Sequence, residues 1–279
     1  MDSLVAAQPL LAQLTIVLAV LTGGIYARGV RRLRRSWPWW RTTVFFLGLA
    51  SLVLALASGI ELLAEDLFSV HMLQHMLLTV AAAPLLMLGA PIRPLLRGVP
   101  ASFRRAVIRP LAGNRAIRGL LRLLRHPLVA VAIYVGGLYL WHWPALYDAA
   151  VENNALHTLE HAHFFIGALL FWSVVIDPEP FKGTLPYAAR IVYLLLAGAA
   201  QNTLLGGLLS FSSRVLYSHY GERAQRLGID ALTDQRIGGA IMWVPGDAIF
   251  LIAVTGAFFL WLETEEREQR RREGGRLRT

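Results

Sequence analysis

The chain has 279 residues, of which 56% are hydrophobic and only 16% are charged, and its net charge is +9. Soluble domains average about 25% charged residues, so this composition indicates an integral membrane protein and argues against a soluble globular one. Cysteine is absent, which excludes disulfides, thiolate metal ligands and thiol-transfer chemistry.

Apolar stretches of membrane-spanning length recur along the whole chain. A hydrocarbon core about 30 Å thick requires about 20 helical residues. We therefore predict an all-α integral membrane protein, a seven-transmembrane helix bundle over residues 1–262, followed by a basic cytoplasmic tail over 263–279. The predicted spans are 9–27, 42–60, 68–90, 127–145, 157–176, 187–209 and 238–262.

Basic residues gather in alternate connections between these spans. Arginines without a single acid fill the connection after the first span and the connection after the third, and more arginines follow the seventh. The positive-inside rule then places the N-terminus outside and the C-terminus in the cytoplasm. The basic excess is thus a signal of topology that also suits anionic membrane lipid, and we do not expect nucleic-acid binding.

Two histidine pairs carry the most functional information. His71 and His75 open the third span, and His157 and His161 open the fifth. Residues four apart lie on one face of a helix about 6 Å from each other. The predicted topology puts both pairs at the outer membrane face, where ionisable side chains in an apolar helix suggest a functional site. We predict a metal site between the two helices; the alternative is interfacial histidines bonded to headgroups or loop carbonyls.

Further residues could complete that site. The wider set of candidate ligands comprises His142, His163, Asp247 and Met72. The thioether of Met72 would favour copper, although methionine in an apolar helix more often serves packing. Asp247 follows Pro245-Gly246, where a break in the helix could free backbone carbonyls, and its carboxylate could pair with a histidine, a metal or Arg236.

Two neighbours of the pairs are candidates for a supporting role. Gln74 extends the polar stripe of the third span. Glu160 lies within His157-x-x-Glu160-His161, which reads as the inverted zinc-protease motif, two ligands and a general base. The motif is short and lies in a membrane helix, so we expect Glu160 to fix an imidazole tautomer rather than to act as a base.

Several separated motifs resemble the CtaG-type family of cytochrome c oxidase assembly factors. They are His71 to His75 with Pro84 to Pro91, Trp141 to Pro144 with Tyr147-Asp148, the histidine pair of the fifth span with Glu160, Asp234 to Gly239, and Met242 to Asp247. The resemblance covers roughly residues 40–262 and implies a multi-pass bacterial inner-membrane protein. It also implies a role in making an active caa-type oxidase and involvement with the copper centres of that enzyme. The chain does not resemble the unrelated single-span copper-delivery protein of the same name.

Together these arguments predict a non-enzymatic assembly factor that binds copper. His71, His75 and His161 form the expected core of the site, since imidazole suits copper and the affinity order favours Cu(II), with zinc as a second candidate metal. The expected partners are cytochrome c oxidase subunits, and a separate copper donor and a homodimer stay open. The alternatives are a metal-free assembly scaffold, a zinc hydrolase that uses Glu160 as base, and a haem or quinone redox protein.

Overall fold

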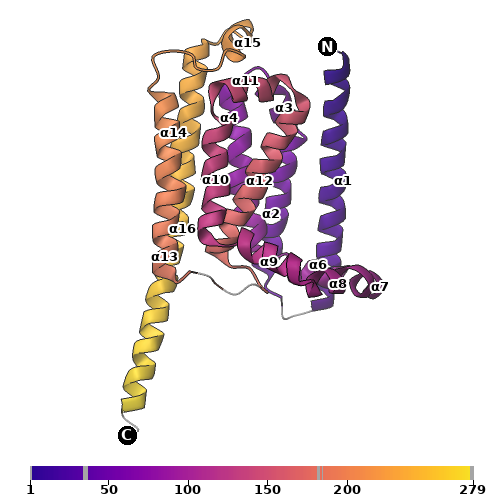
Figure 1. The fold of residues 1–279 in the computed structure, drawn as a ribbon, viewed down its shortest axis with the longest axis vertical. Coiled ribbons are helices and arrows are strands. Elements are labelled where there is room, and N and C mark those ends of the chain that lie inside the picture. The colour runs from indigo at the N-terminus through magenta and orange to yellow at the C-terminus, as the bar shows by residue number, and fades with distance from the viewer. Residues whose placement is uncertain (1, 34–36, 181–182, 184, 277–279) are drawn as a thin grey trace.

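The computed structural model describes residues 2–33, 37–180, 183 and 185–276, so the last three residues of the predicted tail lie outside it (Figure 1). Every regular element in these ranges is a helix. The long elements are α1 (Asp2–Leu33), α2 (Trp39–Leu56), α4 (Phe68–Met76), η2 (Leu77–Ala82), α5 (Ala83–Leu88), α10 (Pro127–Trp141), α12 (Asn154–Ile176), α13 (Tyr187–Tyr193), η4 (Leu194–Ala199), α14 (Ala200–Ser210) and α16 (Ala231–Arg276). The segments α4–η2–α5 and α13–η4–α14 each form one continuous span, in which η is a π-helical turn.

Short helices join the long ones at both ends of the bundle. One end, here called the histidine end, carries α3 (Gly59–Ala64), α11 (Pro144–Glu152) and α15 (Tyr220–Arg226). The opposite end, here called the arginine end, carries α6 (Ile92–Gly98), α7 (Ala101–Phe103), η3 (Arg104–Ile108), α8 (Arg109–Gly113) and α9 (Arg115–Leu124). Figure 1 shows the two termini at opposite ends of the bundle.

The all-helical prediction is confirmed, with six or seven spans. Among the described residues, six helices are long and apolar enough to cross a membrane, and α9 with α10, bent by 62° at their junction, would supply the seventh. The seventh predicted span, over 238–262, lies within a helix that continues to Arg276. Ion pairs four residues apart, such as Glu263 with Arg267 and Glu268 with Arg272, support this extension.

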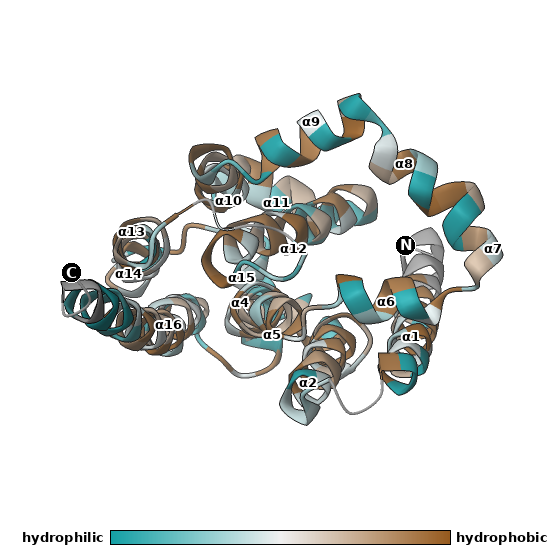
Figure 2. Ribbon diagram, turned by 90° about the horizontal axis from the view of Figure 1, so that it is seen from below, coloured by the Kyte–Doolittle hydropathy of each residue, from teal (hydrophilic) through white to brown (hydrophobic). Residues whose placement is uncertain are grey.

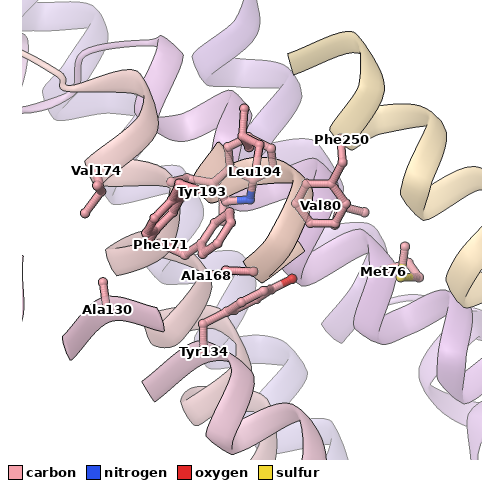
Figure 3. Packing of buried hydrophobic residues seen from close by; sticks show 13 residues of the cluster. Met76, Val80, Ala130, Tyr134, Ala168, Phe171, Val174, Tyr193, Leu194 and Phe250 are labelled. Atoms are coloured by element: carbon pink, nitrogen blue, oxygen red, sulfur yellow. The ribbon is translucent and has the colours of Figure 1, made fainter. Parts of the chain in front are cut away.

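An aromatic core holds α10, α12, α13 and α16 together. The Phe171 ring lies 4.6 Å from that of Tyr134 and 4.7 Å from that of Tyr193 (Figure 3). The Trp172 ring stacks on that of Phe250. The Trp172 indole N–H also donates to the Thr79 carbonyl in η2 at 2.9 Å. This packing fixes α12 against the third span, and so sets how the histidine pairs of the two helices face each other.

Glycines allow α14 and α16 to touch backbone to backbone. A Cβ added at Gly239 would lie 2.6 Å from the Gly206 carbonyl oxygen, and one added at Gly206 would lie 2.8 Å from that of Gly239. Pro245 does not end α16, and Asn202 of α14 donates to the Met242 carbonyl at 2.6 Å. The break that the sequence suggested before Asp247 is therefore absent from the described helix.

A basic arm of short helices, α7 to α9, runs along the outer edge of the arginine end, transverse to the bundle (Figures 1 and 2). None of the residues of α7, η3, α8 and α9 is buried. Arg115, Arg118 and Arg122 share one face of α9 because of their spacing, while leucines occupy the other. Such an amphipathic arm is typical of a helix that lies in the membrane interface.

Candidate metal centre

The helices that carry the two histidine pairs start at the histidine end, and each start is capped. Leu67 cannot cap α4 with its side chain, but Asp234 of α16 accepts hydrogen bonds from the backbone N–H groups of Phe68 (2.7 Å) and Ser69 (3.2 Å). Asn153 caps α12 through Ala155 and Leu156. Capping satisfies N–H groups that a helix start leaves free, so both starts are fixed.

Four imidazoles from α4 and α12 meet between the two helices. The rings of His71 and His75 are 4.3 Å apart, and those of His157 and His161 are 4.2 Å apart. Across the helices, Nε2 of His71 lies 3.3 Å from Nε2 of His157, and the His75 and His161 rings are 5.2 Å apart. This is the convergence that the i, i+4 spacing suggested, and we call these four residues with Glu160 the histidine cluster.

Two overlapping groups within the histidine cluster could hold a metal ion. One consists of His71, His157 and His161, and the other of His71, His75 and Glu160. In each group one ligand atom per residue lies within 4.8 Å of the others. Neutral imidazoles and a carboxylate are ligands for copper, zinc and iron.

Four of the five residues of the histidine cluster are buried, and five of their polar atoms lack hydrogen-bond partners among the described residues. His71 and Glu160 are 0% exposed, and His75 and His161 are each 5% exposed. Among the described residues, both nitrogens of His75, Nε2 of His161 and both carboxylate oxygens of Glu160 have no hydrogen-bond partner. Buried polar atoms without partners cost free energy, and five of them in one place fit a site for a cation.

His142 lies at the edge of the histidine cluster. It follows the last residue of α10, where its Nδ1 donates to the Leu138 carbonyl at 2.7 Å. Its ring centroid is 6.3 Å from that of His75, and its buried Nε2 has no partner among the described residues. The imidazole is thus held in one tautomer, adjacent to the two metal-capable groups but outside both.

Three other candidate ligands point away from the histidine cluster. His163 donates from Nε2 to the Ile133 carbonyl at 3.1 Å, on the side of α12 that faces α10. Met72 is fully buried in an apolar cluster with Phe68. Asp247 accepts from Nδ2 of Asn202 at 3.1 Å and from the Thr203 hydroxyl.

Of the two predicted supporting residues, only Glu160 lies at the site. Its Oε1 is 3.8 Å from Nε2 of His75. Gln74 faces the opposite way and donates to the Ala55 carbonyl at 2.9 Å and to the Glu61 carboxylate, which ties α4 to α2 and α3. Burial raises the pKa of Glu61 to about 7, while its bond to Gln74 opposes that rise.

Two tyrosines that the sequence reading left without a role contact the site directly. Nδ1 of His71 lies 2.7 Å from the Tyr220 hydroxyl and 2.8 Å from the Tyr147 hydroxyl. Burial raises the pKa of both phenols well above the usual value, so both are protonated at neutral pH. Tyr147 lies close in sequence to the Trp141-His142 motif, so the sequence could have indicated that it belongs to the site. Tyr220 follows an irregular connection without a motif, so its sequence context contains no such indication.

Comparison with known proteins identifies the family of the chain. Residues 24–264 match the family described as cytochrome c oxidase caa3 assembly factor (Caa3_CtaG). An uncharacterized protein of Mycobacterium bovis is 30% identical over 253 residues, which cover 87% of this chain and 37% of that protein. An uncharacterized protein of Mycobacterium leprae is 30% identical over 261 residues, which cover 89% of this chain and 38% of that protein.

The chain therefore spans somewhat over a third of the length of these curated relatives. No solved structure matches it. The family match extends from α1 into α16 and includes both histidine pairs, the tyrosine of α11 and the capping aspartate of α16. On this match, the chain belongs to the cytochrome c oxidase caa3 assembly factor family.

Proposed function

We propose that this protein binds copper in the histidine cluster and aids formation of a copper centre in cytochrome c oxidase. The observation that supports copper binding most directly is the set of buried imidazoles and one buried carboxylate, five of whose polar atoms lack hydrogen-bond partners among the described residues. Imidazole ligands without thiolates suit copper, and among divalent ions the affinity order favours Cu(II).

A site that passes its metal to another protein must hold the ion and must also let an acceptor reach it. The histidine cluster has both properties. His71, His75, His161 and Glu160 are buried, whereas His157 is partly exposed. Copper held by few ligands beside a partly exposed one can pass stepwise to an acceptor. Copper is here cargo for the oxidase, and the chain contributes its binding and orientation.

We further propose that the histidine end faces the outside of the bacterial inner membrane. The arginine end carries the long stretch from Pro91 to His126, which contains nine arginines and no acid. The positive-inside rule assigns such a segment to the cytoplasm. Exported copper and the outer surface of the oxidase would then both be on the side of the cluster.

The direct test is elemental analysis of the protein purified in detergent, with an optical spectrum, after loading with copper. We expect near-stoichiometric copper, its loss in the double variant His71→Ala/His75→Ala, and its retention in His163→Ala. His163 is a matched control because it lies on α12 but bonds to Ile133 outside the cluster.

Other results would overturn the proposal. Zinc alone would favour a hydrolase with Glu160 as base, and iron with a Soret band would favour a haem protein. A protein that stays metal-free after copper loading would favour a scaffold that acts without metal.

In cells, the double variant should lower the copper content of the oxidase to the level found when this protein is absent.

A further inference from the structure

The two metal-capable groups share His71, whose Nδ1 contacts two tyrosine hydroxyls, so Nε2 is the nitrogen that can bind a metal. We propose that the histidine cluster holds one copper ion at a time, in either of two positions that share Nε2 of His71. The loading position consists of His71, His157 and His161, and the holding position of His71, His75 and Glu160. This inference rests on the proposed copper binding, which it deepens.

Hydrogen bonds set the tautomer of His71. The Tyr220 hydroxyl donates its proton to the Ala64 carbonyl at 3.1 Å, because a carbonyl oxygen can only accept. The Tyr220 oxygen, 2.7 Å from Nδ1 of His71, must then accept a proton from that nitrogen. A neutral imidazole with its proton on Nδ1 carries its lone pair on Nε2. Nε2 is also the nitrogen that faces His157, at 3.3 Å.

A single lone pair makes the two positions mutually exclusive. His71 belongs to both groups, and Nε2 can bind only one ion. Transfer from the loading to the holding position forms bonds to His75 and Glu160 and breaks those to His157 and His161. The bond to His71 persists, and the oxidation state of the ion does not change. His71 therefore works as the pivot of the exchange.

Burial and charge give the two positions different roles. His157 is the partly exposed member of the cluster, so the loading position has an edge that exchange partners can reach. The holding position is closed, since none of its three residues is more than 5% exposed. It also contains the carboxylate of Glu160, which has no hydrogen-bond partner among the described residues. A cation beside a buried carboxylate offsets the cost of its burial, so copper should rest in the holding position.

The test measures copper stoichiometry and exchange rates on the full chain in detergent. Cu(II) is added, and its removal by a competing chelator is followed over time. We expect one copper per wild-type chain. In His157→Ala the stoichiometry should stay near one, while loading and removal both slow by about tenfold or more. In Glu160→Gln, a change of nearly constant volume, removal should become faster by about the same factor. His163→Ala should match the wild type.

Separate results would overturn the two proposals. A wild-type chain that binds no copper contradicts the proposed function itself. Two coppers per wild-type chain, which requires no variant to fold, would contradict only the shared pivot. Copper binding with exchange rates that neither His157→Ala nor Glu160→Gln alters would also contradict the two-position inference and leave the proposed function standing.

Discussion

Two carboxylates, the partly buried Asp177 and the fully buried Glu160, lie toward opposite ends of the bundle and have opposite surroundings. At the arginine end Asp177 lies between Arg125, at 3.1 Å, and Arg190, at 3.4 Å. At the histidine end Glu160 is fully buried, with no hydrogen-bond partner among the described residues. A charge that the protein itself compensates indicates a structural role, and one that it leaves uncompensated indicates a site for a ligand.

The arginines of the arginine end also fall into two kinds, one buried in the protein and the other on exposed helices. Arg190 is buried and donates to the Val175 carbonyl at 2.7 Å as well as to Asp177. The arginines of the basic arm have no acid beside them in sequence and lie on helices without buried residues. These arginines are therefore either paired inside the protein or exposed, whereas the histidine end brings five buried polar atoms without partners among the described residues into one cluster.

The largest expected effect on stability comes from Asp177→Asn. This change leaves the buried Arg190 and the partly buried Arg125 without their carboxylate, so the free energy of unfolding should fall by about 3 kcal/mol. Thermal or denaturant unfolding in detergent measures the fall. The matched control is Glu179→Gln, because Glu179 is 54% exposed in its side chain and forms only surface pairs with Arg41 and Arg93. The control should lose less than about 1 kcal/mol of unfolding free energy. An equal loss in the two variants would contradict the structural role of Asp177.

A smaller effect, on affinity, is expected from Tyr220→Phe. The change removes the hydroxyl that accepts from Nδ1 of His71 and frees the Ala64 carbonyl. Copper affinity should fall by about tenfold, as it does when groups that orient metal ligands are removed. Competition with a chelator measures it. Tyr217→Phe is the control, since that hydroxyl donates to the His142 carbonyl and not to His71; the same loss in both would mean that the tautomer of His71 is not the cause.

Changes in the basic arm should alter its binding to lipid and leave the affinity for copper unchanged. Replacing Arg115, Arg118 and Arg122 by Gln should weaken its attraction to anionic lipid by about 1 kcal/mol per residue. Since the chain contains no cysteine, a spin label attached at Leu120→Cys can report how deep the arm lies in vesicles. The label should be shallower in the triple variant when anionic lipid is present. Equal depth in neutral and anionic vesicles would show that apolar burial alone holds the arm.

The smallest effect should come from Glu160→Gln without copper. No partner is lost, so the unfolding free energy should not fall, in contrast to Asp177→Asn. The added stability that bound copper gives should shrink at the same time. A loss of about 3 kcal/mol in the copper-free protein would indicate that Glu160 has a protein partner after all.

The sequence predicts most of the fold because membrane helices leave a strong hydropathy signal. The meeting of the four histidines of α4 and α12 could also be predicted from the sequence. The i, i+4 spacing puts each pair on one helix face, and the uneven distribution of arginines places both pairs at the same end of the bundle. The extension of α16 was missed because its charged residues read as a tail. The arm α7–α9 was missed because short amphipathic helices lack a long apolar stretch.

Which way individual side chains point was beyond the sequence. Asp247 turns toward Asn202 and Thr203 because α14 and α16 touch at Gly206 and Gly239. Gln74 was expected beside the histidines, but it faces α2 and α3 because its partners lie there. Tyr220 reaches His71 across 149 positions of the chain, a contact that only the tertiary packing creates.

The π-helical turn η2 begins two residues after His75 and has one further consequence, for insertions and deletions. A π turn contains about one residue more than an α turn, and each residue of an α-helix accounts for about 100° of rotation. Deleting one residue within Leu77–Ala82 would thus convert the π turn into an α turn and leave the rotation of α4 relative to α5 nearly unchanged. Deleting one residue from the α-helical segment Ala83–Leu88 would instead turn α4 by about 100° relative to the end of the span, and His71 and His75 would leave the face of α12. The third span therefore contains one place, η2, where a deletion would leave the two histidine pairs facing each other.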